Sequence, residues 1–397
     1  MPDASRPGAL LLLAPHFEYP ARNGADITHD ELGRALSRHL PYVTLAGMRD
    51  VLRLEGGEVV RHTTFTGGMR PRLAAAARTV LFRSHYYKER FNTPAFARVA
   101  HEHLADPGYG SVLHSYLTTA ALAPLPEPSR RHLVWTHNDE FAWFEDFARQ
   151  NRNPVARLTA RNSIRWIERF WAGHRSDLTL VHVTEADREG WARRLGPHRS
   201  AVVPIGVTLR GAAAPPRPAG APLRLLFVGA LGVRMNLDAL THFAERFFPA
   251  LRARFGDGLL VDVVGSKPLP EVADLCARHG WRLHPDAPDE TLDALFADAT
   301  FSLLPFAYAT GAKLKLLKSL AYGVPFLGTE AVEAQRSLAT PPNLLSDDPS
   351  AWADHAARVQ AEGIGAAART RLRALAEAHS WDASAARFLA ALAPDAP

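Results

Sequence analysis

The stretch LRLLFVGALGVRMNLDAL, residues 223–240, joins a short apolar run to an amphipathic segment through a turn that contains two glycines. The apolar run is typical of a buried strand, and the pattern from Asn236 onward predicts a long helix that stops at Gly256. Gly229 would allow the backbone to approach a ligand closely, and Arg234 is suited to bind phosphate. The glycines do not complete a dinucleotide-binding fingerprint, so a tight turn between strand and helix is an equal alternative.

Strand and helix patterns alternate along most of the chain on both sides of this stretch. Strands are predicted at 8–15, 42–47, 111–117, 132–139, 178–183, 200–207, 223–231, 259–266, 281–285, 300–306 and 325–329. Such alternation predicts an α/β protein with doubly wound parallel sheets. Residues 208–222 are rich in Pro, Gly and Ala and have no apolar period, which favours a linker between domains at 1–207 and 223–379.

The composition also indicates two folded domains, because 397 residues exceed one typical domain and 47% of them are apolar. The net charge of +5 suits phosphate-bearing ligands or an anionic membrane surface. Cys276 is the single cysteine, which excludes an intrachain disulfide and fits a reducing compartment such as the cytoplasm. The apolar run at 9–15 is too short to span a bilayer, and no metal-ligand spacing occurs.

Three of the few lysines, Lys313, Lys315 and Lys318, lie together in a predicted helix at 313–323. Gly311 precedes this helix, whose N-terminus offers free N–H groups and the positive end of the helix dipole. A lysine ammonium is a compact charge that suits phosphate oxygens. The cluster therefore predicts a diphosphate site, and a solvated basic helix face is the alternative.

Polar residues follow a predicted strand in VWTHNDE, residues 134–140. Side chains at the carboxyl end of such a strand lie where open α/β sheets bind ligands. His137 could accept a proton or bind a hydroxyl group, and Glu140 is a second catalytic candidate. Alternatively, Asn138 or Asp139 caps the next helix.

Two other segments have both a functional and a structural interpretation. Asn23 and Gly24 precede a predicted helix and could face phosphate, although the segment alone favours a plain loop. Arginines recur every four residues in the predicted helix 154–175, at Arg157, Arg161, Arg165 and Arg169. This exposed stripe favours a face in contact with solvent, and an anionic membrane or an acidic acceptor is the alternative partner.

Taken in order, these segments resemble the GT-B glycosyltransferases, and within them the retaining, glycogen-synthase-like family 4. YPARNGADITHDELGRAL (19–36) resembles the N-terminal glycine loop and helix of that family. LVHVTEADREGW (180–191) and SAVVPIGV (200–207) resemble the end of its N-terminal domain. LLFVGALGVRMNLDAL (225–240) and FSLLPFAYATGAKLKLLKSLAYGVPFLGT (301–329) resemble its donor domain, and HSWDASAARF its last helix.

The resemblance implies two doubly wound domains that face a central cleft, with a last helix at 380–397 that packs back on the N-terminal domain. It implies transfer of a sugar from a nucleotide diphosphate donor to a sugar, lipid-linked or small-molecule acceptor, with retention and without a cofactor or required metal. No nucleic-acid partner is expected, and the expected location is the cytoplasm, with peripheral membrane contact through the arginine helix.

The resemblance also implies roles for the candidate residues. His137 and Glu140 would be catalytic. The donor would be bound by Asn23, Gly24, Gly229, Arg234, Asn236, Gly311, Lys313, Lys315 and Lys318.

Three positions depart from the family pattern. Members often carry two glutamates eight positions apart, and Thr310 and Lys318 stand at those positions here. A lysine can only donate hydrogen bonds, so Lys318 cannot accept those of a ribose. Ala230 stands where a basic residue commonly holds the diphosphate. The alternative is therefore a catalytically weak or inactive GT-B protein that serves as a binding or partner subunit; a third possibility, sugar-nucleotide epimerisation, has no supporting feature.

Overall fold

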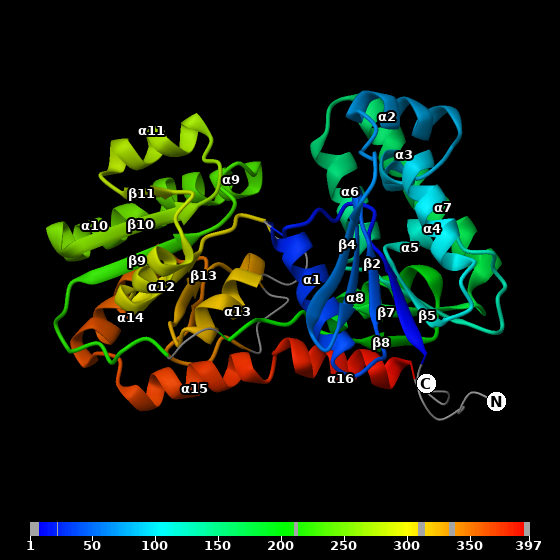
Figure 1. Cartoon of the computed structure of the whole chain (residues 1–397). Helices are drawn as coiled ribbons and strands as arrows, with labels where there is room; N and C mark the ends of the chain where they lie inside the picture. The colour runs from blue at the N-terminus through cyan, green and yellow to red at the C-terminus, as the bar shows by residue number, and fades with distance from the viewer. Residues whose placement is uncertain (1–7, 22, 210–212, 309–313, 333–337, 393–397) are drawn as a thin grey trace. The chain divides into compact units, whose positions relative to one another are not determined.

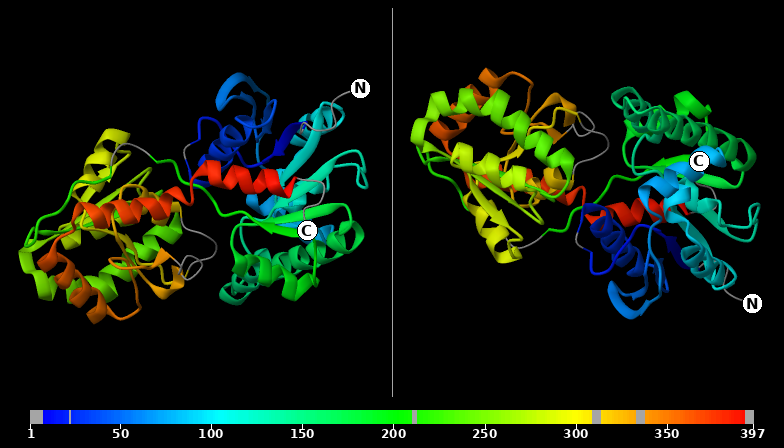
Figure 2. Two further views of the ribbon diagram at one scale, coloured as in Figure 1. Left: turned by 90° about the horizontal axis from the view of Figure 1, so that it is seen from below. Right: turned by 90° about the horizontal axis from the view of Figure 1, so that it is seen from above.

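The structure, a computed structural model, describes residues 8–21, 23–209, 213–308, 314–332 and 338–392. The chain divides into two compact units, the first formed by Met1–Gly206 with Trp381–Pro397 and the second by Val207–Ser380. Each unit contains its own sheet with helices packed against it (Figures 1 and 2). The two sheets are separate, as the alternation of strand and helix patterns predicted.

The first unit is built on a sheet with the strand order β4-β3-β2-β1-β5-β6-β7-β8. Its strands are β1 (Ala9–Leu13), β2 (Val43–Ala46), β3 (Asp50–Glu55), β4 (Glu58–Thr64), β5 (Tyr109–Ser115), β6 (Arg131–Trp135), β7 (Leu178–His182) and β8 (Ser200–Val202). Its helices are α1 (Gly24–Ser37), α2 (Arg72–Leu81), α3 (Tyr86–Phe91), α4 (Pro94–Leu104), α5 (Leu117–Ala120), α6 (Glu140–Gln150), α7 (Pro154–His174), α8 (Glu185–Leu195) and α16 (Trp381–Ala391). Six neighbouring strands of this sheet are parallel, namely β2, β1, β5, β6, β7 and β8.

An antiparallel hairpin, β3–β4, extends this sheet beyond β2 and was not predicted. Its turn holds Gly56 at φ 56° and Gly57 at φ 93°. Two successive residues with positive φ match the tight turns that join antiparallel strands, and glycine adopts this backbone without steric cost. A Gly-Gly pair between strand-like segments is thus the signal that could have revealed the hairpin.

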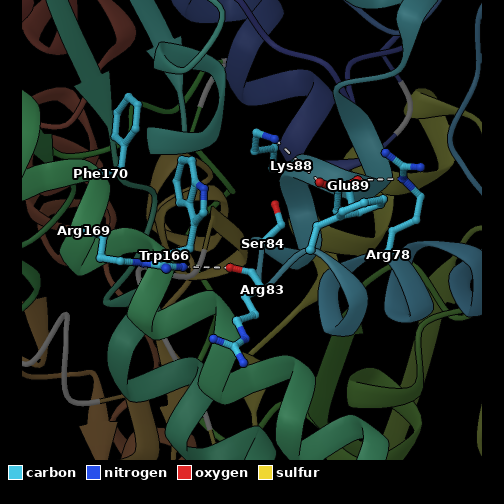
Figure 3. A pocket seen from close by; sticks show the side chains of 9 residues that line it. Arg78, Arg83, Ser84, Lys88, Glu89, Trp166, Arg169 and Phe170 are labelled. Atoms are coloured by element: carbon cyan, nitrogen blue, oxygen red, sulfur yellow. Dashed lines mark hydrogen bonds and ion pairs between the residues drawn. The ribbon is translucent and has the colours of Figure 1, made fainter.

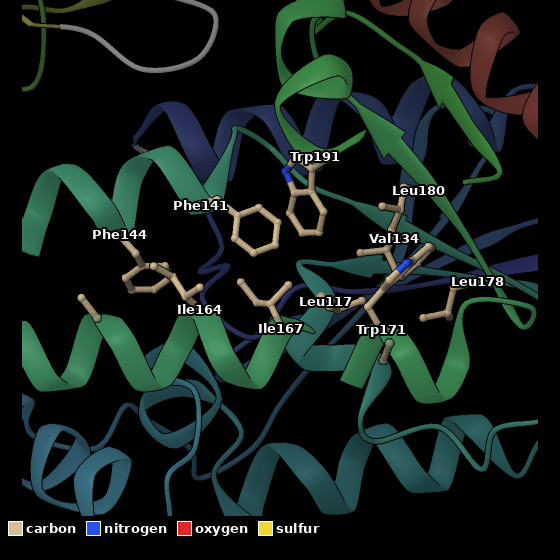
Figure 4. Packing of buried hydrophobic residues seen from close by; sticks show 12 residues of the cluster. Leu117, Val134, Phe141, Phe144, Ile164, Ile167, Trp171, Leu178, Leu180 and Trp191 are labelled. Atoms are coloured by element: carbon tan, nitrogen blue, oxygen red, sulfur yellow. The ribbon is translucent and has the colours of Figure 1, made fainter. Parts of the chain in front are cut away.

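Helices cover both faces of the first sheet because its central strands are buried on both sides. In β6, Val134 points to the core that α6, α7 and α8 cover, where Ile167 and Trp191 also lie (Figure 4). The next side chain, Trp135, points to the opposite face. There its ring meets Phe388 of α16 at 5.4 Å between ring centroids. Helix α4 packs on β1 through a second apolar core.

Helix α16 brings the end of the described chain back to the first unit. The Nη2 atom of Arg38, the residue that follows α1, lies 2.6 Å from Asp382 Oδ1. Ser384 Oγ donates a hydrogen bond to the Pro204 carbonyl at 2.7 Å. The absence of a side chain at Gly206 leaves room for Trp381 at the start of α16, because a Cβ atom on Gly206 would lie 2.4 Å from the Trp381 ring. Any larger residue at position 206 would displace α16.

The second unit is built on a parallel sheet with the strand order β11-β10-β9-β12-β13-β14. Its strands are β9 (Leu223–Val228), β10 (Leu259–Gly265), β11 (Arg282–Pro285), β12 (Phe301–Leu304), β13 (Phe326–Gly328) and β14 (Leu344–Leu345). Its helices are α9 (Arg234–His242), α10 (Phe248–Phe255), α11 (Pro270–His279), α12 (Asp289–Asp298), α13 (Leu314–Ala321), α14 (Pro349–Glu362) and α15 (Ala366–Glu377). A short 3₁₀ turn, η2 (Gly256–Gly258), precedes β10.

The described part of the predicted linker, 208–222, packs on the second unit. The Ala214 N–H donates to the Tyr322 carbonyl at 2.7 Å, and the Arg217 N–H donates to the Ile364 carbonyl at 2.8 Å. Ala214 is also part of an apolar core with residues of β9, β10 and α12. The Pro-rich composition therefore marks an extended segment that is held against the unit by hydrogen bonds.

The predicted single helix at 236–256 is interrupted. Between α9 and α10 lies one π-helical turn, η1 (Phe243–Phe247), and Pro249 occupies the first turn of α10. Proline has no N–H to donate and clashes with the preceding turn, which favours a local widening of the helix. The aromatic rings of Phe247 and Trp352 stack at this point, 4.2 Å apart.

The arginine stripe of α7 is exposed, as predicted, at all four positions from Arg157 to Arg169. The opposite side of α7 is apolar, and Ile164, Ile167 and Trp171 are buried there. In the part of the chain that the structure describes, no helix is both long enough and apolar enough to cross a membrane.

We expect Ile167→Ala to destabilise the first unit by about 2–5 kcal/mol, because the fully buried side chain would leave a cavity between α7 and the sheet. The matched control is Leu158→Ala on the same helix, since Leu158 is 40% exposed and its loss should cost less than about 1 kcal/mol. Urea unfolding followed by circular dichroism measures both. Equal losses in the two variants would contradict this account of the core.

Candidate functional site

A close approach of backbone and side chains marks the carboxyl end of β9 in the second unit. A Cβ atom on Gly229 would lie 3.0 Å from Lys315 Nζ and 3.1 Å from the Asn236 amide. A Cβ atom on Gly265, at the end of the neighbouring β10, would lie 1.6 Å from the Gly229 carbonyl oxygen. Glycine is therefore required at position 265, and a Cβ atom at position 229 would press on the Lys315 and Asn236 side chains. The ammonium group of Lys315 thus lies directly beside the backbone at the end of β9.

Lys315 is held in place by polar and aromatic partners. Its Nζ atom donates a hydrogen bond to Asn236 Oδ1 at 2.7 Å, and Asn236 Nδ2 donates to the Ala230 carbonyl at 2.8 Å. The ammonium group lies 4.8 Å from the ring centre of Phe227 and 4.9 Å from that of Phe306. Aromatic faces attract a cation. The result is a fixed positive charge at the end of β9, on a side chain that α13 supplies.

Arg234, the first residue of α9, is engaged in an exposed ion pair. Its Nε atom lies 2.9 Å from Asp238 Oδ1, and Tyr308 donates its hydroxyl hydrogen to Asp238 Oδ2 at the same distance. The Arg234 side chain is 72% exposed. Surface ion pairs of this kind contribute little stability, so a ligand phosphate could replace Asp238 as the partner of Arg234 at low cost.

Of the other residues predicted around the lysine helix, the structure describes only some. Lys318 is half-buried on α13, three residues after Lys315, and thus on a neighbouring part of the helix surface. Thr310, Gly311 and Lys313 lie outside the described residues. The described part of the predicted diphosphate site is therefore Gly229, Arg234, Asn236 and Lys315, with Lys318 beside it.

In the first unit, a chain of hydrogen bonds joins His137 to α1. Ser115 Oγ lies 2.9 Å from His137 Nε2 and 2.9 Å from His29 Nε2, and His29 Nδ1 lies 2.7 Å from the Ala25 carbonyl. Only a protonated Nδ1 can bond to that carbonyl, so Nε2 of neutral His29 accepts the Ser115 hydroxyl hydrogen. Ser115 then accepts from His137 Nε2, which leaves Nδ1 of His137 as a hydrogen-bond acceptor.

Burial keeps this histidine cluster neutral. It lowers the pKa of His29 to about 4 and that of His137 well below its ordinary value, with a further decrease at His137 from its neighbours His29 and His16. Burial and His29 lower the pKa of His16 to about 3. At neutral pH, His137 therefore accepts hydrogen bonds rather than carrying a positive charge.

His16 is an unusual member of this cluster, because neither of its buried ring nitrogens has a hydrogen-bond partner among the described residues. Its ring lies 4.9 Å from that of His29 and 5.5 Å from that of Tyr116, between ring centroids. Buried polar atoms are usually paired, so unpaired ones indicate a place for a ligand or water. The sequence analysis did not identify four members of this cluster, His16, His29, Ser115 and Tyr116. Of these, only His16 could have been recognised as a candidate, because it closely follows β1 just as His137 follows β6.

Glu140 lies deeper than its predicted catalytic role suggested. It is 2% exposed at the start of α6, and neither carboxylate oxygen accepts a hydrogen bond from the described residues. His85 Nε2 lies 3.5 Å away. Burial raises the pKa of Tyr116, and the charge of Glu140 raises it further. Asp139 caps α6 by accepting a hydrogen bond from Ala142 N, as the structural alternative predicted.

Asn23 and Gly24 are exposed at the start of α1. Asn23 Oδ1 accepts hydrogen bonds from the N–H groups of Ala25 at 3.0 Å and Asp26 at 3.1 Å. This cap is the structural alternative to phosphate binding, because it occupies two of the free N–H groups of the helix. Asp26 lies beneath the cap, where burial raises the pKa of its carboxyl group to about 6.

Within the described ranges, His, Cys, Asp and Glu side chains do not assemble in threes as metal ligands would.

The cluster predicts an acid-sensitive first unit. The pKa of folded His16, about 3, lies below its ordinary value of 6.5, so the unfolded chain takes up this proton first as the pH falls. The stability that the neutral ring contributes is complete above 6.5 and is lost toward pH 3, by about 1.4 kcal/mol for each pH unit. Urea unfolding between pH 7 and pH 4 should show a smaller slope against pH in His16→Phe. The exposed His39→Gln is the control, and equal slopes in the wild type and His16→Phe would contradict the prediction.

Comparison with known proteins gives one family match and several similar solved structures. Residues 222–362 match the family described as Glycosyl transferases group 1, whereas no curated protein matches the chain. Sucrose-phosphate synthase from Thermosynechococcus elongatus is a similar solved structure, with a TM-score of 0.67, 16% identity, and coverage of 96% of this chain and 97% of that one.

Two further solved structures match over nearly the whole chain. The trehalose 6-phosphate synthase of Burkholderia multivorans has a TM-score of 0.62 at 14% identity, with 98% of each chain covered. The Anabaena protein HepE, solved in complex with UDP and glucose, has a TM-score of 0.59 at 11% identity, with 96% of this chain and 98% of that one covered. At such identities the likeness shows the fold alone, and that fold is GT-B, as the sequence predicted.

Proposed function

We propose that the protein is a retaining glycosyltransferase, similar to family 4, that transfers a sugar from a nucleotide diphosphate donor. The observation that carries this proposal is the fixed ammonium group of Lys315 beside Gly229, at the carboxyl end of β9. Ligands of open α/β sheets bind at such strand ends. The segment that matches the glycosyltransferase family includes both residues, and the similar HepE structure contains UDP and glucose.

The proposed chemistry assigns charge stabilisation to the second unit. When the bond between sugar and diphosphate breaks, negative charge develops on the diphosphate, and a preorganised cation stabilises it without reorganisation. Lys315 supplies that cation, and Arg234 can add a second by exchanging Asp238 for phosphate. The acceptor hydroxyl oxygen then bonds to the sugar, and its proton passes to an oxygen of the departing diphosphate. The acceptor classes are a sugar, a lipid-linked molecule and a small molecule.

The proposed role of the first unit is to bind hydroxyl groups of the sugar or acceptor through its histidine cluster. Neutral His137 offers Nδ1 as an acceptor, and the unpaired nitrogens of His16 offer two more polar contacts. Glu140 is buried beside His85, which suits a role in the local electrostatic field better than contact with substrate. We further propose that the protein works in the cytoplasm and contacts a membrane peripherally through α7.

Lys318 favours a second candidate function, a GT-B protein that binds nucleotides but transfers sugar weakly or not at all. Lys318 stands where the family often has a ribose-binding glutamate, and an ammonium group accepts no hydrogen bonds. A thermal-shift panel of nucleotide sugars identifies a ligand under either candidate, because a ligand that binds the folded state raises Tm. Turnover of that ligand then separates them: hydrolysis or transfer supports the enzyme, and binding without turnover supports the partner subunit.

We expect Lys315→Ala to weaken binding of a nucleoside diphosphate by about 1.5–3 kcal/mol while binding of the plain nucleoside changes little, because only the diphosphate contacts the ammonium group. Isothermal titration with UDP and with uridine measures the two affinities. Arg278→Ala, at an exposed cation on α11, is the control and should leave both unchanged. Equal losses for UDP and uridine would mean that Lys315 only supports the local structure.

We expect His137→Ala to reduce turnover by about tenfold to a hundredfold without weakening UDP binding, because a group that positions substrate acts on the reaction step. Steady-state transfer or donor hydrolysis, measured beside UDP titration, tests this. Unchanged turnover in a correctly folded variant would remove His137 from the proposed site.

A further inference from the structure

Exposed apolar side chains are concentrated on and beside α2 and α7, two helices of the first unit that pack against each other. Among the described residues, ten large apolar side chains are exposed, and six of them lie on or beside these two helices. They are Met69, Leu73, Leu81, Phe82, Val155 and Leu158. Leu73 and Leu81 are 86% and 74% exposed. Apolar exposure at this density marks an interaction surface, which we call the α2–α7 face.

The same face is strongly basic. Segments 66–92 and 154–174 together contain ten Arg and Lys residues and two acidic residues, Glu89 and Glu168. Both carboxylates already have cationic partners: Arg78 Nε lies 2.8 Å from Glu89, and Arg194 Nε lies 2.7 Å from Glu168. The surface around the exposed apolar residues therefore carries an excess of positive charge.

A cavity of about 550 Å³ opens in this face (Figure 3). Four cations line it, Arg78, Arg83, Lys88 and Arg169, and the single carboxylate is Glu89. The rings of Trp166 and Phe170, which also line it, stack at 4.9 Å between centroids. Phe82, which is 56% exposed, lies at the cavity as well as among the apolar residues. The cavity thus combines anion-binding groups with apolar walls.

The backbone carbonyl of Arg83 holds the side chain of Arg169, one of these four cations. Arg83 follows α2 with φ 47°, a left-handed conformation that costs a non-glycine residue about 1–2 kcal/mol. The Arg169 Nη2 atom donates a hydrogen bond to the Arg83 carbonyl at 2.8 Å, and Figure 3 shows the guanidinium group reaching across. Such backbone persists where the surroundings hold it, often at binding sites.

We propose that the α2–α7 face docks on an anionic lipid bilayer, with a lipid phosphate in the cavity and Leu73, Leu81 and Phe82 inserted at the interface. Peripheral membrane sites combine basic groups at the headgroup level with apolar groups that reach deeper, and this face has both. The inference rests on the peripheral contact proposed above and not on the donor site. A second copy of the chain is a poorer occupant, because a two-fold interface would bring two positive faces together.

Vesicle co-sedimentation tests the proposal. The wild type should bind vesicles that contain phosphatidylglycerol but not vesicles of phosphatidylcholine alone, and added salt should release it, since charge interactions at a surface are screened. Arg83→Ala should weaken binding about fivefold, the equivalent of about 1 kcal/mol for one basic residue. Leu73→Ser with Leu81→Ser should weaken it at least as much. Both leucines are exposed, so these substitutions should not impair folding.

Two control variants distinguish vesicle binding through this face from non-specific binding by any exposed apolar or basic residue. Val60→Ser replaces an apolar residue on β4 that is also exposed, at 53%, and Arg254→Ala replaces an exposed arginine on α10. Neither should change vesicle binding. Equal binding to both kinds of vesicle, binding that the α2–α7 substitutions leave unchanged, or a concentration-dependent dimer that Leu81→Ser abolishes would each overturn the proposal. UDP titration of the same variants should match the wild type, so failure here is distinguishable from failure of the donor site.

Discussion

The parallel hydrogen bonding of buried central strands is the constraint on which the rest of this structure depends. In the first unit, β1 pairs with β2 on one side and β5 on the other, and its residues are 0–2% exposed. A parallel strand cannot turn directly into its neighbour, so the chain must cross over one face, usually as a helix. The crossovers cover both faces and leave the carboxyl ends of the strands as the open edge. The Gly229 turn of one unit and the histidine cluster of the other both lie at such edges.

The sequence was sufficient to predict this architecture where the pattern is local. Continuous apolar runs identified the parallel strands, and the alternation with helices identified the fold class. It was weaker where tertiary contacts decide the structure. The helix from Asn236 was continuous by pattern but is interrupted before Pro249.

The contacts within the candidate site were even less predictable from the sequence than the helix boundaries. The contact of Lys315 with Asn236 joins residues 79 positions apart, and that of His29 with Ser115 joins residues 86 apart. No periodicity encodes such pairs, because they depend on how strand ends and helices meet. The spacing of residues along one helix, by contrast, gave the exposed arginine stripe directly. Residues at strand ends were therefore predictable as candidates, but their partners and protonation states required the structure.

The edges of the two sheets have a consequence for how the chain behaves at high concentration. An exposed strand edge offers unpaired backbone groups to another molecule, and it is a common starting point for aggregation. Here β8 has three residues and β14 two, and β11 ends in Pro285. The fourth edge, β4, is long, but Glu58, Arg61 and His62 lie along it and are exposed. A strand from a second chain would meet short, charged or proline-terminated edges on every side, so each sheet is protected against extension by intermolecular β-pairing.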